Sequence, residues 1–433
     1  MIVKLLLDRK REGRELPVED IQELIAAYTR GDVPDYQMAA FAMAVCCKGM
    51  TDAETLALTQ SMRDSGRCLD WSDLPQPTAD KHSTGGVGDK LSLIIQPLAA
   101  ACGLAVPSLT GRGLGLTGGT ADKMESIPGY VAGLSLDDYH RVVADCGCTL
   151  TVQTAEIAPA DKKLYGLRDV TGTVPSIPLI VASILSKKLA EGAGTLVFDV
   201  KCGAGAFMKT RADATALAQA LVTISKGAGR KAAALVTTMD EPLGLTVGNA
   251  LEVEESIEVL KGVSKATDVA ELSIEFAAQM VALAKGIPLD EARTQCRENL
   301  ANGEAYRRFV RMVELHGGSL EKFAAVCAEP IETLEVKAAS AGFVAKIEAQ
   351  PIAQAAFELG AGRAQTTDTL DLRAGVRLCV TRGDAVAAGQ TLAVLYAKDR
   401  SAKLPVAAKL VEGAISMSSI CPDIPSRIVE KIV

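Results

Sequence analysis

DKHSTGGVGD, at residues 80–89, and TGRGLGLTGGT, at residues 110–120, are the two stretches that decide the fold of this chain. Their glycines allow the backbone to come close to a ligand, and their hydroxyl and cationic side chains bind oxyanions. An apolar, alanine-rich segment at 92–102 follows the first stretch, and a short apolar run at 104–109 leads into the second. Strand, glycine-rich turn and helix form the α/β arrangement that places ligands at the carboxyl ends of strands. We therefore expect an anion site, for a phosphate or a phosphate ester, built from both loops.

The α/β pattern continues further along the chain. A helical segment at 177–190 precedes an apolar strand at 195–200, and a helix at 212–227 precedes a strand at 232–238. Between them, KCGAGAFMK at 201–209 is a third glycine loop, which lacks the glycine that precedes the lysine of a Walker loop. Alternating helices and apolar strands predict a buried, largely parallel sheet.

The two ends of the chain differ from this middle part. Residues 17–65 carry apolar side chains at helical spacing, whereas short β runs with Gly-Asp turns begin at about residue 335. The sequence therefore predicts a helical N-terminal region and a strand-rich C-terminal module. A length of 433 residues fits two or three domains.

Composition argues against several classes of protein. A net charge of −7 is unlike that of a nucleic-acid binder, which carries a basic patch or stripe. No apolar run of 18 residues spans a membrane, and the first residues become charged too soon for a signal peptide. The 11 cysteines are scattered without a CxxC pair, as expected of buried free thiols. We expect a cytoplasmic protein that binds neither nucleic acid nor membrane.

Further polar side chains mark a second candidate site. Ser183 and Lys187 are four residues apart, so on a helix they share one face. With Arg168 they could donate hydrogen bonds to the carbonyl oxygens of a planar ligand, or Lys187 could be a snorkelling cation beside a spectator hydroxyl. His82, one of only three histidines, places a titratable group beside the expected anion.

Longer motifs carry a resemblance to a known family. Over nearly its full length the chain resembles the pyrimidine nucleoside phosphorylase and thymidine phosphorylase family. The matching strings are KHSTGGVGD (81–89), GRGLG (111–115), TGGT (117–120) with DK (122–123), ESIPG (125–129), APADK (158–162), LYGLRDV (164–170), DVK (199–201) and VGNALEV (247–253).

The resemblance implies an α/β fold with a small all-helical domain, a large α/β domain with a mixed sheet, and a strand-rich α+β C-terminal module. The helical, base-binding domain would comprise 1–70 and 163–193, and the phosphate-binding domain 75–160 and 195–330. The C-terminal module would cover 335–433. Family members are homodimers.

The resemblance also implies a reaction, the reversible phosphorolysis of a pyrimidine nucleoside to free base and pentose 1-phosphate. Phosphate is a co-substrate, and no cofactor is expected. The catalytic residues would be His82, Arg168 and Lys187, with a proton on His82 available to the base carbonyl. The phosphate ligands would be Lys81, Ser83, Ser92, Thr110 and Thr120. The base would be held by Tyr165, Arg168, Ser183 and Lys187, with Leu114 and Leu116 beside it.

The sequence departs from the family pattern at four positions. Leu116 stands in place of a histidine, Thr110 in place of a serine, and Ser108 where some members carry lysine. At Lys90, some members have a small side chain and bind potassium, with the other ligands matching Gly88, Leu243, Thr246 and Glu255. We expect Lys90 to replace that ion and to pair with Glu255, which predicts activity independent of potassium and no metal site.

Other functions remain open on the sequence. A phosphoribosyltransferase of the anthranilate type shares the fold but needs a magnesium–pyrophosphate site, and a nucleoside-monophosphate phosphorylase needs further cations. Altered nucleoside specificity is conceivable because of Leu116. A non-catalytic homologue should lack Lys81, Arg168 or Lys187, and all three are present.

Overall fold

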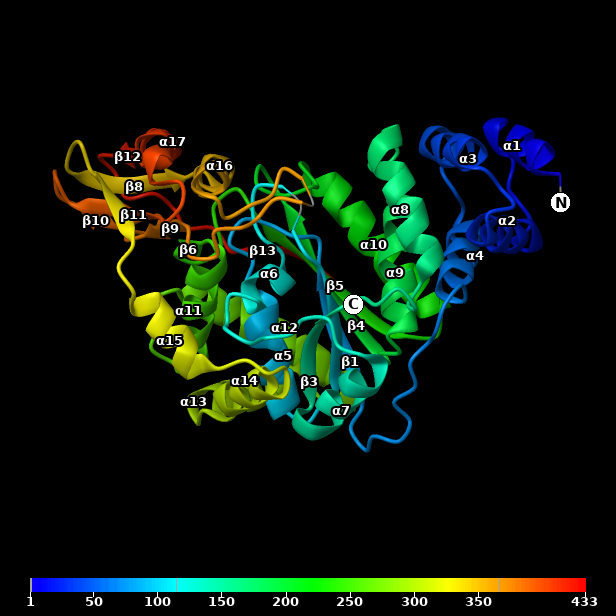
Figure 1. The fold of residues 1–433 in the computed structure, drawn as a ribbon, viewed down its shortest axis with the longest axis horizontal. Helices are drawn as coiled ribbons and strands as arrows, with labels where there is room; N and C mark the ends of the chain where they lie inside the picture. Colours follow the sequence, from blue (N-terminus) through cyan, green and yellow to red (C-terminus); the bar gives the residue numbers. More distant parts are fainter. Residues whose placement is uncertain (1, 114, 366) are drawn as a thin grey trace.

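A computed structural model describes the whole chain except residues 1, 114 and 366. Its helical part lies at one end of the long axis, the α/β part in the middle and the C-terminal strands at the other end (Figure 1). The predicted fold class is confirmed: a helical bundle, a large α/β part with a mixed sheet, and a strand-rich C-terminal part.

The helical part combines the N-terminal helices with two helices from later in the chain. One apolar core joins them, made by residues such as Leu24, Phe41, Leu58, Leu164 and Leu179. The helices are α1 (Val3–Arg11), α2 (Val18–Arg30), α3 (Asp35–Lys48), α4 (Asp52–Arg63), α8 (Pro159–Thr171) and α9 (Ile177–Ala190).

A buried ion pair fixes the start of α4 against α1. Thr51 and Glu54 form a reciprocal capping box at this helix N-terminus. The same Glu54 carboxylate accepts hydrogen bonds from Lys10 Nζ at 2.7 and 2.8 Å, and both side chains are buried. The bundle that carries α8 and α9 is therefore held by a polar contact as well as by its apolar core.

The central sheet has the strand order β1-β4-β5-β13. Strands β1 (Ala79–Ser83), β4 (Thr195–Cys202) and β5 (Lys231–Thr238) are parallel, and β13 (Ile428–Ile432) is antiparallel to β5. A separate parallel pair consists of β2 (Val106–Thr110) and β3 (Cys148–Val152). The last strand of the chain thus lies in the central sheet, although the sequence places it with the C-terminal module.

Helices surround these strands. They are α5 (Leu91–Ala101), α6 (Thr120–Met124), α7 (Leu136–Cys146), α10 (Arg211–Gly227), α11 (Asn249–Leu260), α12 (Thr267–Lys285), α13 (Leu289–Ala301), α14 (Glu304–Leu315) and α15 (Leu320–Ala328). The described part of the chain holds no helix that is both long and apolar enough to cross a membrane.

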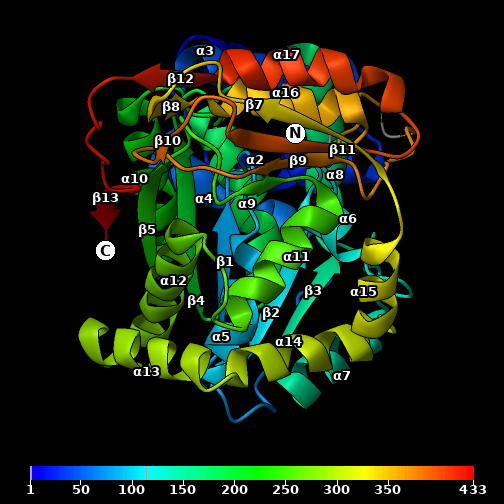
Figure 2. The same ribbon diagram turned by 90° about the vertical axis from the view of Figure 1, so that its left-hand side faces the viewer.

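The C-terminal part contains two small antiparallel sheets. Its elements are β7 (Glu332–Lys337), β8 (Gly342–Ile347), α16 (Ala349–Leu359), β9 (Gly375–Leu378), β10 (Ala385–Val386), β11 (Thr391–Ala397), η1 (Ser401–Lys403), α17 (Leu404–Ala414) and β12 (Ile415–Ser418). The short strand β6 (Thr246–Val247), from the α/β part, pairs with β9. Helices α16 and α17 lie side by side above strands β9 and β11 (Figure 2), and α16 begins next to the α/β part, where the Ala349 N–H donates to the Asp240 carbonyl oxygen at 2.9 Å.

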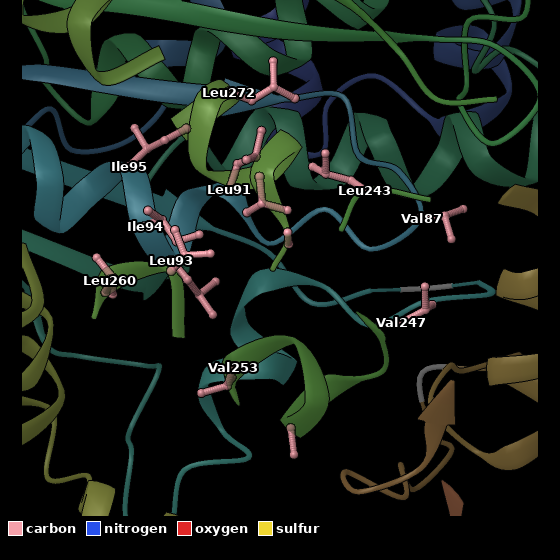
Figure 3. Close-up of a cluster of buried hydrophobic side chains, with 14 of the residues drawn as sticks. Val87, Leu91, Leu93, Ile94, Ile95, Leu243, Val247, Val253, Leu260 and Leu272 are labelled. Atoms are coloured by element: carbon pink, nitrogen blue, oxygen red, sulfur yellow. The ribbon is translucent and has the colours of Figure 1, made fainter. Parts of the chain in front are cut away.

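The main core lies beneath the first glycine loop (Figure 3). Leu91 and Ile94 of α5 are fully buried there with Leu243 and Val253, and Val87 of the loop joins them. Burying an aliphatic side chain of this size contributes about 1.5–3 kcal/mol. The loop that carries the phosphate-site residues is therefore anchored by its own apolar side chain.

Candidate active site

Both glycine loops line one cavity of about 600 Å³. The first loop follows β1, and the second runs from the end of β2 to the start of α6. The expected phosphate ligands all line this cavity, together with Leu116, Tyr165 and Lys187: they are Lys81, Ser83, Ser92, Thr110 and Thr120. Leu114, expected beside the base, lies outside the described residues.

Lys81, which lines this cavity, shares one carboxylate with a second buried lysine, Lys201. Asp199 Oδ2 lies 3.4 Å from Lys81 Nζ and 2.6 Å from Lys201 Nζ, and all three side chains are inaccessible to solvent. Neither ammonium group makes a well-directed hydrogen bond within the described part of the chain. A buried charge is costly unless it is paired and hydrogen-bonded, and two ammonium groups beside one carboxylate leave an excess of positive charge.

Asp89 is a second carboxylate near these cations. Its Oδ2 accepts a hydrogen bond of 2.5 Å from Ser83 Oγ. Burial raises the pKa of Asp89, but Lys81, Lys201 and Lys123 outweigh that effect, so the pKa lies far below its usual range. The carboxylate is therefore ionised, and it already uses the hydroxyl of one expected phosphate ligand.

Sequence reasoning missed Lys123, which lines the cavity, and Lys201, which shares Asp199 with Lys81. Lys123 Nζ donates to the Asp89 carbonyl at 2.6 Å and lies 2.7 Å from Glu252 Oε2. The available signals were the position of Lys123 just after the TGGT motif, and that of Lys201 at the end of an apolar strand.

The second loop is folded around a single carboxylate. Asp122 Oδ2 accepts hydrogen bonds from the backbone N–H groups of Gly113 at 2.7 Å and Gly119 at 2.8 Å. Its Oδ1 accepts a hydrogen bond from Arg363 Nη1 at 2.7 Å. A Cβ atom on Gly113 would lie 2.5 Å from the Gly119 nitrogen, so this close approach requires glycine. The fold of the loop holds Thr120, at the N-terminus of α6, at the cavity wall.

The expected base ligands lie on α8 and α9. Lys187 Nζ contacts Asp161 Oδ2 at 2.5 Å and Ser183 Oγ at 3.1 Å. Lys187 is therefore held in an ion pair at the cavity wall and does not snorkel into solvent. Tyr165 is half exposed. A smaller cavity of about 210 Å³ includes Tyr165, Ser183 and His82 in its lining, so the base and phosphate sides meet at His82.

Arg168 uses much of its guanidinium on the chain itself. It donates hydrogen bonds to the carbonyl oxygens of Thr173 at 3.2 Å, Val174 at 2.9 Å and Leu179 at 3.0 Å. These three bonds fix the connection between α8 and α9. Because a guanidinium has five N–H groups, two remain for a ligand in the cavity that Arg168 also lines.

The structure disfavours the expected protonated state of His82. Burial, followed by the positive charges of Lys188, Lys187 and Lys81, holds the pKa of this imidazole well below its usual value, against the opposing effect of Asp89. His82 is therefore neutral near pH 7. In that state it can donate a hydrogen bond to a ligand but carries no extra proton for transfer to the base.

Lys90 is buried and forms an ion pair with Glu255. Its Nζ donates to the carbonyl oxygens of Leu243 at 3.0 Å and Thr246 at 2.9 Å, and it also contacts the Glu255 carboxylate. The backbone of Gly88 closes the same space, because a Cβ there would lie 2.6 Å from the Leu243 oxygen. The Lys90 ammonium group thus occupies this set of oxygen acceptors.

Three family models match successive parts of the chain. A glycosyl transferase family helical bundle domain matches residues 4–66, and a glycosyl transferase family α/β domain matches residues 75–306. A pyrimidine nucleoside phosphorylase C-terminal domain matches residues 343–418.

Relatives match over the whole length. A thymidine phosphorylase of Mesorhizobium japonicum is 43% identical over 440 residues, covering 100% of this chain and 99% of its own. A pyrimidine-nucleoside phosphorylase of Geobacillus stearothermophilus is 43% identical over 434 residues, covering 99% of each chain. A pyrimidine-nucleoside phosphorylase of Bacillus subtilis is 45% identical, covering 90% of this chain and 91% of its own. The chain therefore belongs to the family of thymidine and pyrimidine-nucleoside phosphorylases, as its motifs predict.

A solved structure shares the fold. The crystal structure of anthranilate phosphoribosyltransferase from Thermus thermophilus matches with a TM-score of 0.59 and 21% identity. The match covers 72% of this chain and 98% of that one.

Proposed function

We propose that the protein is a pentosyltransferase that catalyses the reversible phosphorolysis of pyrimidine nucleosides. Inorganic phosphate and a pyrimidine ribo- or deoxyribonucleoside give the free base and the pentose 1-phosphate. The observation that carries this proposal is the buried Lys81 ammonium group, which lines the cavity of both glycine loops and shares the Asp199 carboxylate with Lys201. The names of the relatives support the same reaction.

The phosphate side of the cavity would orient the nucleophile. Lys81 would neutralise part of the phosphate charge, and four hydroxyl groups would fix its rotation: Ser83, Ser92, Thr110 and Thr120. An oxygen of the phosphate would form a bond to C1′ of the sugar while the bond from C1′ to the base nitrogen breaks. Holding a weak nucleophile in line with the bond that breaks is an orientation effect.

The base side would stabilise the leaving group. The electron pair of the broken bond stays on the pyrimidine, whose carbonyl oxygens gain negative charge. Lys187, Ser183 and the free N–H groups of Arg168 are placed to donate to those oxygens. Donors fixed before the reaction and aimed at developing charge contribute strongly to the rate. Neutral His82 would add a hydrogen bond at the junction of the two sides.

The C-terminal match favours this reaction over that of a phosphoribosyltransferase. The likeness to the phosphoribosyltransferase shows the fold alone and covers 72% of the chain. The match at residues 343–418 is to the C-terminal domain of pyrimidine nucleoside phosphorylases.

We further propose a cytoplasmic homodimer. Ile2 and Leu5 at α1 and Tyr36 and Met43 on α3 are exposed apolar side chains at one end of the molecule (Figure 1). A two-fold contact buries the same patch on both copies. Sedimentation analysis of Leu5→Glu and Tyr36→Glu variants should show a monomer, with wild-type protein as a dimer.

The proposed reaction is tested by the release of free base from uridine, thymidine, deoxyuridine, cytidine and a purine nucleoside, each with and without phosphate. We expect release only from pyrimidine nucleosides and only with phosphate. The corresponding nucleoside monophosphates are assayed in the same way. Release of base from these monophosphates and from none of the nucleosides would instead assign a nucleoside-monophosphate phosphorylase.

A further inference from the structure

Lys188 connects the base-binding helix to both phosphate-binding strands. Its Nζ lies 2.5 Å from Asp80 Oδ2, 2.8 Å from Glu191 Oε2 and 3.0 Å from the Leu109 carbonyl oxygen. Since an ammonium group has three N–H donors, these three acceptors occupy every donor of Lys188. The side chain is 3% exposed, and both carboxylate side chains are fully buried.

Two of the three partners of Lys188 adjoin a residue of the site. Asp80 directly precedes Lys81 in β1, and Leu109 directly precedes Thr110 in β2. On its own helix, Lys188 directly follows Lys187. A displacement of the Lys188 ammonium would therefore move the base ligands on α9 relative to the phosphate ligands on β1 and β2.

Additional hydrogen bonds hold the partners in place. Glu191 Oε2 also accepts from the Leu109 N–H at 3.0 Å, and its carbonyl oxygen accepts from Trp71 Nε1 at 2.7 Å. Asp80 Oδ1 accepts from Gln96 Nε2 at 3.2 Å, and the same amide donates to Ser108 Oγ at 2.8 Å. The network thus includes α5, α9, β1 and β2.

Lys188 and His82 both line the cavity of the two glycine loops. The charged groups around His82 are Lys188 and Lys187 from α9, Lys81 from its own strand and Asp89 from the first loop. Tyr165 and Arg168, from α8, line the smaller cavity with it. Burial lowers the pKa of Lys188, but Asp80 and Glu191 raise it by more, so the ammonium stays charged at all physiological pH values.

We propose that Lys188 is a positioning residue, which fixes α9 relative to β1 and β2 and presents a permanent positive charge to His82. The inference rests on the proposed function, because α9 and the two strands serve as base and phosphate sides only in that reaction. Misplacing reacting groups by about 1 Å costs on the order of 10² in rate. Loss of Lys188 should therefore lower kcat far more than it weakens the binding of phosphate.

Steady-state kinetics and calorimetry test the positioning role. We expect Lys188→Met to lower kcat on the order of 10²-fold while the Kd for inorganic phosphate stays within a few-fold of wild type. Lys188→Arg should keep the charge but remain impaired in kcat, because a planar guanidinium does not reproduce the three contacts of an ammonium. Lys226→Met, which changes an exposed lysine on α10, is the matched control.

Removing Lys188 leaves Asp80 without its cation, so the single variant could unfold. Lys188→Met combined with Asp80→Asn removes one of the two carboxylates, and the other, Glu191, can take up a proton because burial raises its pKa well above the usual value. This double variant should show the same loss in kcat. A folded Lys188→Met or double variant with kcat within about three-fold of wild type, against the 10²-fold loss expected from misplacement, would overturn the positioning role.

NMR titration of the histidine side chains tests whether the positive charge of Lys188 acts on His82, and the measurement does not require catalysis. The chain has only three histidines, so a His82→Gln variant assigns the His82 signal. In Lys188→Met the His82 titration midpoint should rise, and in Lys188→Arg it should stay near the wild-type value. An unchanged midpoint in Lys188→Met would overturn this part of the inference. If wild-type protein shows no phosphorolysis but the midpoint moves as expected, the proposed function fails while the charge relationship holds.

Discussion

Lys90 and Glu255 form a buried ion pair between residues 165 positions apart in the sequence. Lys90 follows the first glycine loop, and Glu255 lies on α11. Glu255 also accepts hydrogen bonds from the N–H groups of Leu245 at 2.7 Å and Thr246 at 3.1 Å. Burial raises the pKa of Glu255, but Lys90 and these hydrogen bonds more than offset it, so the pKa lies below its usual value. The Glu255 carboxylate therefore stays ionised, and the ion pair holds the loop against α11.

The first prediction concerns potassium. Because the Lys90 ammonium occupies the cation position, activity should be equal in sodium and potassium buffers of the same ionic strength. The measurement is the initial rate of base release in each buffer. A rate that disappears without potassium and returns when the ion is added would contradict the assignment of Lys90.

The second prediction concerns the stability that this pair confers. Removing one partner of a buried ion pair costs about 3–5 kcal/mol, so Lys90→Thr should lower the free energy of unfolding by that amount. The carbonyl oxygens of Leu243 and Thr246 and the Glu255 carboxylate remain, so potassium should restore part of the loss. Denaturant titration in sodium and in potassium measures both effects, with the exposed Lys226→Thr as control. Equal stability of Lys90→Thr and wild type would show that the pair contributes little.

The third prediction concerns phosphate binding by the two buried lysines that share Asp199. Lys81→Met should weaken phosphate binding and lower kcat/KM for phosphate by about 10²–10³-fold, the typical cost of losing one stabilising contact. Lys201→Met should weaken phosphate binding as well, because its ammonium shares Asp199 with Lys81. Calorimetric titration with inorganic phosphate gives the affinities. Wild-type phosphate affinity in both variants would place the anion elsewhere.

The fourth prediction concerns Arg168. Its guanidinium satisfies three carbonyl oxygens between Thr173 and Leu179. Each buried acceptor left without a partner costs about 1–3 kcal/mol, so Arg168→Met should lower the free energy of unfolding by several kcal/mol as well as impair base binding. Thermal and denaturant unfolding report the first effect. A variant of full stability with impaired base binding would assign Arg168 to the ligand alone.

The fifth prediction is a dependence of stability on pH. Burial lowers the pKa of both His82 and His316 in the folded protein. Between these folded values and the unfolded value of about 6.5, the unfolded chain binds more protons, so stability falls as pH falls through this window. His82→Gln should reduce that slope by up to about 1.4 kcal/mol per pH unit, the contribution of one proton. Denaturant unfolding between pH 5 and 8 tests it, and an unchanged slope would mean that folding leaves the pKa of His82 near its unfolded value.

Local sequence signals predict much of the architecture. Apolar periodicity predicts the helix at 177–190 with the bounds that the structure has for α9 (Ile177–Ala190). The glycine loops predict an anion site, and the structure brings both loops to one cavity. These features depend on neighbours in the chain, which the sequence shows directly.

The remaining features depend on contacts between distant segments. Asp199 and Lys201 are two residues apart on one strand and so share a face, but nothing in the sequence brings Lys81 to the same carboxylate, because that contact follows from the pairing of β1 with β4. The neutral state of His82 arises from lysines on α9 that surround it only in the folded chain. The return of β13 to the central sheet likewise depends on its pairing with β5, which lies far earlier in the chain.

The most direct test of the central claim is a ³¹P NMR measurement of wild-type protein with inorganic phosphate and thymidine or uridine. The account predicts that the phosphate signal declines as a pentose 1-phosphate signal and an equal amount of free pyrimidine appear. Lys81→Met should show neither change over the same period. Release of base without a new phosphate ester, or no release from any pyrimidine nucleoside, would contradict phosphorolysis as the activity of this cavity.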